Sequence, residues 1–282
     1  MVIYLNGAYI EKDQARVSLD DRGFLFADGV YEVIRAYNGV LFEAPAHLAR
    51  LSDGLRKLQI GFVGAGEISA IADRLLDENE VPPDGFRLYV QITRGTAPRR
   101  HAFPDPGTPP TIYCEVGPLA THPEEQERGA AAITTADQRW ARCDIKTIGL
   151  LPNVLASQLA AEAGASEAIF IRDGMVTEAS HSSVLGVVDG VVRTAPLSNH
   201  ILAGVTRRVV LDLCDDLGIR VAAFPMAEPE MRAADELFIT GTSSEVTPIV
   251  QLDGRPIADG KPGPITRRLQ QAFWSRTRTV GA

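Results

Sequence analysis

The chain has 282 residues, of which 45% are hydrophobic and 23% charged, and its formal net charge is −8 at pH 7. This composition is typical of a soluble globular protein with one large domain or two ordinary ones. The acidic charge, with no long basic cluster, argues against nucleic acid as a partner, and no apolar run is long enough to span a membrane. Three cysteines without paired spacing and a start without a signal peptide predict a cytoplasmic protein with reduced thiols. The five scattered histidines predict no metal site.

The first part of the chain opens with two predicted hairpins, each built around an Asn-Gly pair. Asn-Gly between β-rich runs is the strongest short-range hairpin signal. Two helices follow, and the first places Leu48, Leu51, Leu55 and Leu58 on one face. Two buried strands then lead to a polar stretch at 121–129. The predicted elements are hairpins 2–10 and 30–44, helices 47–60 and 66–80, and strands 85–95 and 110–119.

The second part mixes helices with strand pairs that flank Asp-Gly turns. Strands and helices do not alternate regularly, which favours an α+β fold in two domains over a doubly wound sheet. We expect a smaller N-terminal domain at 1–120, a linker at 121–126 and a larger C-terminal domain at 127–282. The predicted elements are helix 153–164, strand pairs 167–180 and 183–195, helix 204–219, strand 235–241 and helix 263–278.

Lys146 is one of only four lysines, whereas most basic residues of the chain are arginines. A lysine amine that loses its proton is a nucleophile and forms Schiff bases with aldehydes such as pyridoxal phosphate. The ordinary alternative is a lysine at a strand end with its ammonium group in water, and this stretch alone favours that alternative. The other lysines lie in polar turns or on the polar face of a helix. A catalytic lysine in this chain would therefore be Lys146.

A pyridoxal phosphate site also needs a partner for the ring nitrogen and a cradle for the phosphate. Glu178, after a predicted strand, is a candidate for the nitrogen. Gly204, Val205 and Thr206 begin a predicted helix, where free N–H groups and the helix dipole suit an anion. The TGTSS turn at 240–244 and Arg50 would add donors and charge. Each has an ordinary alternative: a solvent-facing glutamate, a capping threonine, a plain turn and a solvated arginine.

Eight segments, spread nearly end to end, resemble a known family. They are DRGFLFADGVYEVIRAYNG, HLARL, TRGTAPRRHAFP, RWARCDIKTIGLL, VTEAS, ILAGVTR, DELFITGTSSEVTP and ITRRLQQAF. Together they are similar to class IV pyridoxal-phosphate aminotransferases, most closely to the D-amino acid (D-alanine) branch. RWARCDIK with TRGTAPRRHAFP is the pairing typical of that branch. The resemblance implies a two-domain α+β fold, fold type IV, in a homodimer with active sites at the domain and subunit interfaces.

The resemblance also implies roles for individual residues. Lys146 is the lysine that binds the cofactor covalently, Glu178 pairs with the ring nitrogen, and Leu202 packs against the ring. The expected phosphate-binding positions are Arg50, Val205, Thr206, Gly241 and Thr242.

The expected substrate-binding positions lie on one strand and one loop. Tyr31 faces the substrate carboxylate, and Arg99 and His101 form a carboxylate trap that reaches across from the other subunit. Val33 and Arg35 follow Tyr31 on its strand. Arg35 would either favour acidic substrates or be a solvated strand residue, and the sequence does not choose between them.

Four positions depart from the family pattern. His181 and Ser183 stand near positions where relatives carry a serine and an asparagine, in a loop that borders the cofactor. Gly241 stands where a serine often contacts the phosphate, which removes one hydroxyl. Arg100 is larger than the usual residue inside the trap. The departures in the loop leave the substrate preference open.

The implied activity is ping-pong transamination from a D-amino acid, such as D-alanine or D-glutamate, to a 2-oxo acid, such as 2-oxoglutarate or pyruvate. A branched-chain L-aminotransferase is the nearest alternative, and the Arg-Arg-His run speaks against it. Aminodeoxychorismate lyase shares the fold and the lysine, and the altered 179–183 stretch leaves it open. A protein that carries the cofactor without turnover and a cofactor-free α+β protein are the remaining alternatives.

Overall fold

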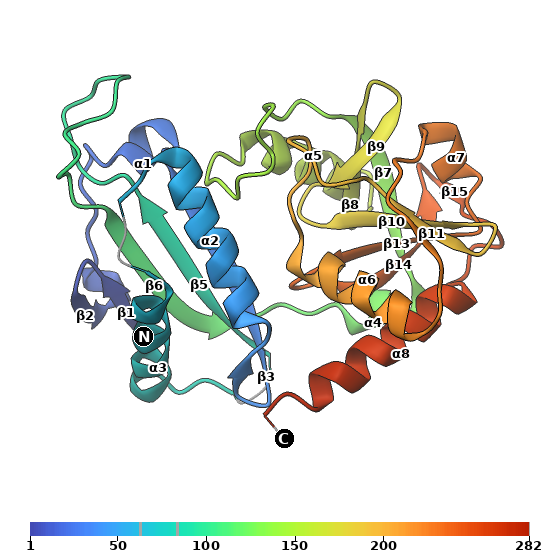
Figure 1. Ribbon diagram of the computed structural model, residues 1–282, viewed down its shortest axis with the longest axis horizontal. Coiled ribbons are helices and arrows are strands. Elements are labelled where there is room, and N and C mark those ends of the chain that lie inside the picture. Colours follow the sequence, from blue (N-terminus) through green and yellow to red (C-terminus); the bar gives the residue numbers. More distant parts are fainter. Residues whose placement is uncertain (62–63, 83–84, 282) are drawn as a thin grey trace. The chain divides into compact units, whose positions relative to one another are not determined.

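The computed structural model describes residues 1–61, 64–82 and 85–281. They form two compact units, whose helices and strands are labelled in Figure 1. The first unit comprises Met1–Ala120, Ile145–Leu150 and Val280–Ala282, and the second comprises Thr121–Asp144 and Leu151–Thr279. The short stretch that carries Lys146 therefore packs with the first unit, although it lies between two stretches of the second unit in sequence.

The first unit is built on a six-stranded antiparallel sheet with the strand order β2-β1-β6-β5-β3-β4. Helix α2 packs on β3, and helix α3 packs on β6 and β1. The strands are β1 Val2–Leu5, β2 Ala8–Glu11, β3 Gly29–Tyr37, β4 Val40–Leu41, β5 Phe86–Thr93 and β6 Thr111–Pro118. The helices are the 3-10 turn Lys12–Gln14, α1 Arg22–Phe26, α2 Ala44–Leu58 and α3 Ala65–Glu78.

The core of the first unit lies between its sheet and helices α2 and α3. Leu48, Leu51 and Leu55 are buried there, which confirms the predicted apolar face of the helix. Burial alternates along β3, where Val30 and Ile34 belong to this core. The alternation places Tyr31, Val33 and Arg35 on the opposite face of the sheet.

The second unit is built on a nine-stranded mixed sheet with the order β12-β11-β10-β13-β14-β7-β8-β9, and β15 pairs with β14. β7 runs parallel to both β8 and β14, whereas the hairpins are antiparallel. The strands are β7 Ala130–Ala136, β8 Glu167–Arg172, β9 Met175–Ala179, β10 Ser183–Val188, β11 Val191–Thr194, β12 Val221–Ala222, β13 Glu236–Gly241, β14 Glu245–Leu252 and β15 Arg255–Pro256.

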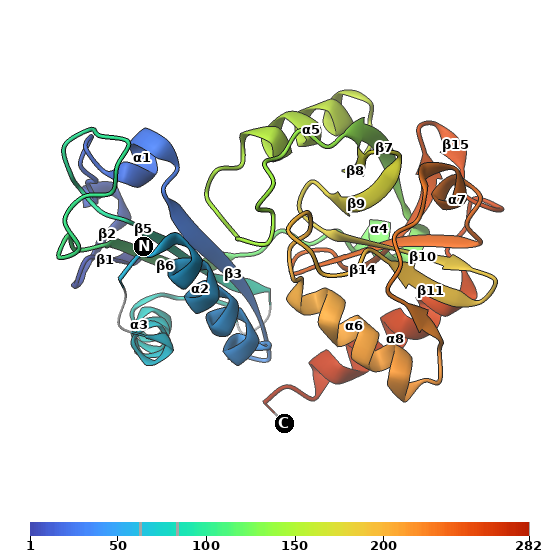
Figure 2. The same cartoon turned by 45° about the horizontal axis from the view of Figure 1, so that its top comes forward.

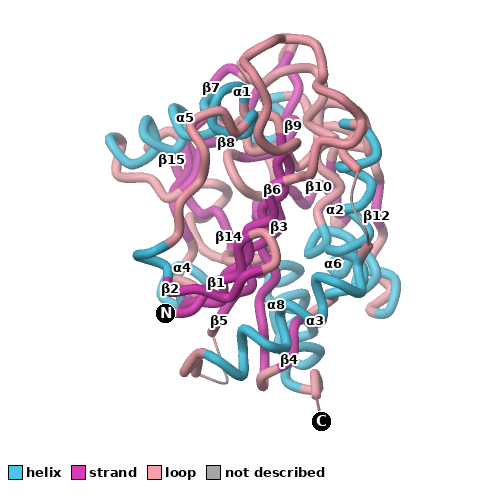
Figure 3. The backbone as a smooth tube through the Cα atoms, turned by 90° about the vertical axis from the view of Figure 1, so that its left-hand side faces the viewer, coloured by secondary structure: helices cyan, strands magenta, loops and turns pink. Residues whose placement is uncertain are grey.

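Helices cover the second sheet at different places. α6 packs on β13 and on α8, and α8 packs on β13 and β14 (Figure 3). α5 packs on β7 and β8 through Ala156 and Ala160, which contact Phe170 in a small core cluster. The helices are α4 Pro123–Arg128, α5 Leu151–Glu162, α6 Val205–Asp216, α7 Glu228–Arg232 and α8 Pro264–Arg278. Hairpins and helices intermingle in both units, so the α+β prediction is confirmed.

The tight turns have the backbone that their sequences predict. In all four, both central residues have positive φ, from 48° to 92°. Two-residue hairpin turns favour this left-handed conformation, and Asn, Asp and Gly adopt it most easily. The turns are Asn6-Gly7, Asn38-Gly39, Asp173-Gly174 and Asp189-Gly190.

Candidate active site

Lys146 lies in a short segment of the first unit that runs along β3. The backbone N–H of Tyr31 donates to the Lys146 carbonyl oxygen at 3.0 Å, and the N–H of Ile148 donates to the Gly29 carbonyl oxygen at 3.1 Å. A Cβ atom at Gly29 would lie 2.7 Å from a backbone oxygen of β5, so this close approach requires glycine. The Nζ atom of Lys146 is 4.3 Å from the centroid of the Tyr31 ring. The fold thus brings the predicted nucleophile beside the predicted carboxylate-facing tyrosine.

Arg50 is fixed by a buried carboxylate on the helix-covered side of β3. Glu32 is fully buried and accepts hydrogen bonds from Arg50 Nε at 2.6 Å, from Arg50 Nη2 at 2.8 Å and from His47 Nδ1 at 2.8 Å. Burial alone would raise the pKa of Glu32, but Arg50 and His47 outweigh it and lower the pKa to about 2. Burial is also the main cause that lowers the pKa of His47, and the charges of Arg50 and Lys146 add to it. The cluster thus fixes the Arg50 guanidinium, and its His47 is close enough to Lys146 to feel the charge of that lysine.

We expect Glu32→Gln to lower the free energy of unfolding by about 2 kcal/mol at pH 7, because Arg50 loses a charged partner inside the protein. The folded-state pKa of Glu32 lies below its ordinary value of 4.5, so its stabilisation is present above pH 4.5 and is lost as the pH falls towards 2. The difference between wild type and variant, measured by urea unfolding, should therefore shrink below pH 4.5. Asp53→Asn, at an exposed ion pair with Arg56, is the control and should change stability by less than about 1 kcal/mol. An equal loss in both variants would contradict the prediction.

The face of β3 away from the helices carries the predicted substrate residues. Tyr31, Val33 and Arg35 are half-buried on this face, and the Tyr31 ring lies 6.0 Å from that of Tyr89 on β5, centroid to centroid. The Arg35 guanidinium carbon lies 4.6 Å from the ring centroid of Tyr37. Along β3 the order on this face is Tyr31, Val33, Arg35 and Tyr37. The Arg35 side chain therefore extends away from Tyr31, and Val33 is the neighbour of Tyr31 on this face.

Glu178 is the residue before the last in β9 of the second unit and is buried. One carboxylate oxygen accepts the backbone N–H of Leu202 at 3.0 Å, and the other forms an ion pair with Arg139. The predicted ring-nitrogen partner and the predicted ring-packing leucine are therefore joined directly. The carboxylate is oriented from two sides, as a group that recognises a single nitrogen atom needs to be.

Arg139 is the residue of this cluster that the sequence did not reveal. Its guanidinium donates to both carboxylate oxygens of Asp137, at 2.9 and 2.8 Å, and its carbon lies 4.4 Å from the ring centroid of Phe170. Burial would lower the pKa of Arg139, but Asp137 and Glu178 outweigh it and raise the pKa. Burial likewise opposes ionisation of Asp137, but Arg139 and Arg172 lower its pKa to about 2. Arg139 and Arg172 thus keep Asp137 ionised, and Arg139 also joins Asp137 to Glu178.

Helix α6 begins without a side-chain cap. Val205 and Thr206 are its first residues, and the N-cap Gly204 supplies no side chain to cap their N–H groups. A Cβ atom at Gly204 would lie 2.7 Å from the Ser183 hydroxyl, so a side chain there would crowd this space. An uncapped start of a twelve-residue helix is suited to an anion.

The turn after β13 lies against the same β10 strand as Gly204. A Cβ atom at Gly241 would lie 2.7 Å from the Ser244 hydroxyl and 3.6 Å from Ser182 Cβ. Among the described residues, the buried hydroxyls of Thr240 and Ser244 have no hydrogen-bond partner. The Ser244 hydroxyl thus lies beside Gly241, the position where the family often has a serine hydroxyl. Spare hydroxyl donors, small residues and the uncapped helix fit a phosphate group, with Thr242 in the same turn.

Glu167 organises the loop at 180–183, where the sequence departs from the family pattern. This buried carboxylate accepts hydrogen bonds from the hydroxyls of Ser180 and Ser182, the latter at 2.6 Å, and lies 3.2 Å from His181 Nδ1. The ring of His181 is half-exposed, so this nitrogen is held while the rest of the ring faces outward. Glu167 was not among the predicted residues, because a carboxylate inside a strand gives no signal of its partners.

Arg99 and His101 are exposed on the long loop between β5 and β6. The His101 ring lies 5.6 Å from the Phe26 ring, centroid to centroid, and the Arg99 guanidinium carbon lies 5.3 Å from the same ring. Both predicted trap residues thus lie near one aromatic side chain of α1. Figure 2 shows the backbone of this loop beside α1.

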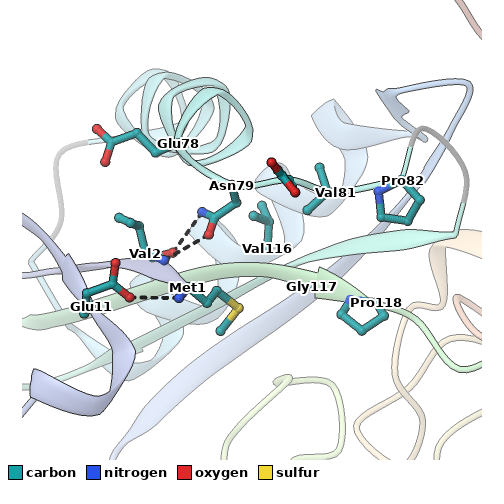
Figure 4. Close-up of a pocket in the computed structure, with 11 residues that line it drawn as sticks. Met1, Val2, Glu11, Glu78, Asn79, Val81, Pro82, Val116, Gly117 and Pro118 are labelled. Carbon is teal, nitrogen blue, oxygen red and sulfur yellow. Dashed lines mark hydrogen bonds and ion pairs between the residues drawn. The ribbon is translucent and has the colours of Figure 1, made fainter.

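One pocket of the first unit lies away from all predicted site residues. It measures about 360 Å³ and is bordered by the N-terminus, Asn79 and the end of β6 (Figure 4). The N-terminal ammonium group forms an ion pair with Glu11 at 2.8 Å, and Asn79 accepts the Val2 N–H at 2.9 Å. None of its lining residues is a nucleophile or an anion-binding arginine, so we assign it no role.

Two other features to consider are metal-binding clusters and membrane-spanning helices. Residues 1–61, 64–82 and 85–281 contain no group of three or more His, Cys, Asp or Glu side chains arranged to hold a metal ion. Within these ranges, no helix has the length and apolar character needed to cross a membrane.

The predicted residues thus form two sets, one in each unit. The set in the first unit is Tyr31, Val33, Arg35, Arg50, Arg99, His101 and Lys146. The set in the second unit is Glu178, Leu202, Val205, Thr206, Gly241 and Thr242.

Comparison with known proteins identifies the family. Residues 29–252 match the family described as amino-transferase class IV. The chain is 42% identical over 274 residues to a D-alanine aminotransferase of Bacillus licheniformis, covering 97% of this chain and 96% of the relative. It is also 42% identical over 272 residues to a D-alanine aminotransferase of Staphylococcus epidermidis, covering 96% of each chain.

Solved structures agree with this at the level of the fold. A branched-chain amino acid aminotransferase of Escherichia coli superposes with a TM-score of 0.91 at 25% identity, covering 97% of this chain and 93% of that one. The branched-chain aminotransferase of the archaeon Thermoproteus uzoniensis with norvaline gives a TM-score of 0.88 at 26% identity, covering 99% and 95%. From the match to residues 29–252 and the identity over nearly its whole length, the chain belongs to the class IV aminotransferases.

Proposed function

We propose that this protein is a pyridoxal-phosphate-dependent transaminase that moves the amino group of a D-amino acid, such as D-alanine or D-glutamate, to a 2-oxo acid. The observation that carries the proposal is the Lys146 amine, 4.3 Å from the Tyr31 ring centroid, in a chain 42% identical to a D-alanine aminotransferase. The acceptor would be 2-oxoglutarate or pyruvate, in a ping-pong sequence in which the enzyme keeps the amino group between two half-reactions.

Residues of both units would hold the cofactor. Bound pyridoxal phosphate supplies an electron sink for the pair of electrons released when the α-proton leaves. Lys146 would bind it covalently and, once displaced by the substrate amine, carry that proton as general base. Glu178, oriented by Arg139 and the Leu202 N–H, would hold a proton at the ring nitrogen. The other proposed contacts are Leu202 to the ring, and Arg50, Val205, Thr206, Gly241 and Thr242 to the phosphate.

The substrate would be bound through its carboxylate. We propose Tyr31 of one subunit with Arg99 and His101 of the other, because a guanidinium beside an imidazole and a phenol suits a carboxylate. Val33 would contact the side chain of the substrate. The direction of Arg35, towards Tyr37, supports the hypothesis of a strand residue outside the contact more than that of an anchor for acidic substrates.

A homodimer in the cytoplasm is part of the proposal, with domains at 1–120 and 127–282 joined by 121–126. The support for self-association is an exposed apolar row on α5, formed by Leu151, Val154, Leu155 and Leu159. Rows of this kind are covered by partners more often than they are left in water. Sedimentation analysis at micromolar concentration tests the dimer.

The test of the function is the visible absorption spectrum with two donors. We expect a yellow protein that loses its visible absorbance with D-alanine and keeps it with L-leucine. The position of the carboxylate trap decides whether the α-proton of a D- or of an L-amino acid points towards Lys146. A branched-chain L-aminotransferase is the second candidate, since solved structures of that name superpose with TM-scores of 0.91 and 0.88. Loss of absorbance with L-leucine alone would favour it. A colourless protein that does not take up pyridoxal phosphate would overturn both.

A further inference from the structure

The loop that carries Arg99 and His101 leaves the sheet through a narrow base. Gly95 has φ +91°, and a Cβ atom there would clash with the carbonyl oxygen of Pro109, at the other end of the loop. The N–H of Arg22 donates to the Gly95 carbonyl oxygen at 2.9 Å. The two ends of the loop are thus closed against each other beside α1.

The side chain of Arg22 reaches from α1 to the middle of this loop. Its Nη1 atom donates to the carbonyl oxygen of Arg100 at 2.6 Å, and the carbonyl oxygen of Ala102 lies 3.4 Å away. Arg100 is the residue between Arg99 and His101. The Arg22 side chain is only 4% exposed, so these hydrogen bonds are protected from water. One buried guanidinium therefore fixes the backbone on which both trap side chains stand.

Arg22 is in turn fixed by a second arginine through a shared carboxylate. Its Nε donates to Asp28 at 2.8 Å, and Asp28 accepts two more hydrogen bonds from Arg94, at 2.7 and 2.9 Å. Burial would raise the pKa of Asp28, but Arg94 and Arg22 outweigh it and lower the pKa. Arg94 also donates to the carbonyl oxygens of Leu58 and Gln59 at the end of α2. The network ties the loop to the start of β3 and the end of α2.

The ring of Phe26 is the second support. The Arg22 guanidinium carbon lies 4.8 Å from its centroid, and the corresponding carbon of Arg99 lies 5.3 Å away. The His101 ring is 5.6 Å away, centroid to centroid. α1 thus presents a buried guanidinium to the loop backbone and an aromatic ring to the two trap side chains.

We propose that Arg22 and Phe26 are positioning residues for substrate binding, which set the placement of the Arg99 guanidinium and the His101 imidazole. The proposal rests on the function proposed above, in which these two groups bind the substrate carboxylate. Arg22 and Phe26 touch neither substrate nor cofactor; they act through the loop. A displacement of about 1 Å in a group that binds substrate is enough to lower catalytic efficiency by one to two orders of magnitude.

The test is the steady-state KM for D-alanine in the holoenzyme with Arg22→Lys. Lysine keeps the charge beside Asp28 but cannot bridge Asp28 and two carbonyl oxygens in one plane. We expect KM to rise about tenfold, kcat to change less than about twofold, and hydrogen exchange of residues 99–104 to become faster. Arg193→Lys is the matched control, because Arg193 also joins a carboxylate, Glu230, to a backbone carbonyl, that of Pro225, and should leave KM unchanged.

A double-mutant cycle with Arg99→Ala separates positioning from general damage. If Arg22 acts through the trap, Arg22→Lys should raise KM much less in the Arg99→Ala background than in the wild type. An equal rise in both backgrounds overturns the proposal, and so does an unchanged KM in Arg22→Lys. An unchanged KM in Arg99→Ala itself refutes the trap, and with it this part of the proposed function. If Arg22→Lys does not fold, Phe26→Leu is the substitute variant, because it keeps the hydrogen bonds between Arg22, Asp28 and Arg94. An unchanged KM for D-alanine in Phe26→Leu also counts against the proposal.

Discussion

Lys146→Ala is expected to lower kcat for transamination by at least about 10⁴-fold, because the variant loses both the covalent bond to the cofactor and the general base. The side chain stands beside Tyr31, on a segment whose backbone is hydrogen-bonded to β3. The other residues proposed to hold the cofactor lie on other elements. We therefore expect the variant to bind pyridoxal phosphate weakly and without the absorbance of the wild type, while its unfolding midpoint stays within a few degrees.

Two further variants test the role of the Lys146 amine more specifically. Lys146→Arg keeps a positive charge at the position but no nucleophilic amine, and should be as inactive as the alanine variant. Lys261→Ala, in a surface turn, is the matched control and should keep full activity. Partial recovery of Lys146→Ala by added methylamine would identify proton transfer as the missing step. Activity within tenfold of the wild type in Lys146→Ala would remove the assigned role of this lysine.

Sequence reasoning succeeded where local signals agree with each other. The Asn-Gly and Asp-Gly turns fix their own backbone, and the leucines at 48, 51 and 55 announce both a helix and its buried face. It failed for β7 and β14, which were not among the predicted strands. β7 reads AAAITTA, and alanine has little preference for strands; its place depends on parallel pairing with β8 and β14, which are far away in sequence.

The candidate site divides in the same way. Lys146 stood out by its rarity among arginines, and the remaining positions followed from the family resemblance. The ion pairs that orient these residues were not predictable, because Arg139 and Glu178 are 39 positions apart, and Glu32 and Arg50 are 18 apart. Arg22 was quoted only as part of a motif. Its contact with the loop backbone arises from two distant segments that close beside each other.

Arg139→Gln is expected to cost about 3–5 kcal/mol of unfolding free energy at pH 7, because it removes the partner that Asp137 and Glu178 share in the interior. The Arg139 side chain is 6% exposed, so water does not replace it. Arg142→Gln is a matched control: it stands three positions later and also pairs with an aspartate two positions away, Asp144, but is 47% exposed. That variant should keep nearly the stability of the wild type, because water screens an exposed ion pair.

The pH dependence of this loss identifies its cause. In the wild type the pKa of Asp137 is about 2, below its ordinary value of 3.8, so the stabilisation is present above pH 3.8 and is lost as the pH falls towards 2. Without Arg139, Asp137 takes up its proton at a higher pH, which removes its uncompensated charge. The stability difference between wild type and Arg139→Gln, from urea unfolding, should therefore be largest near pH 7 and smaller at pH 4. A difference that stays constant from pH 7 to pH 4 would show that Arg139 stabilises by packing on Phe170 rather than by charge. The proposed electrostatic link from Arg139 through Glu178 to the ring nitrogen would then be lost.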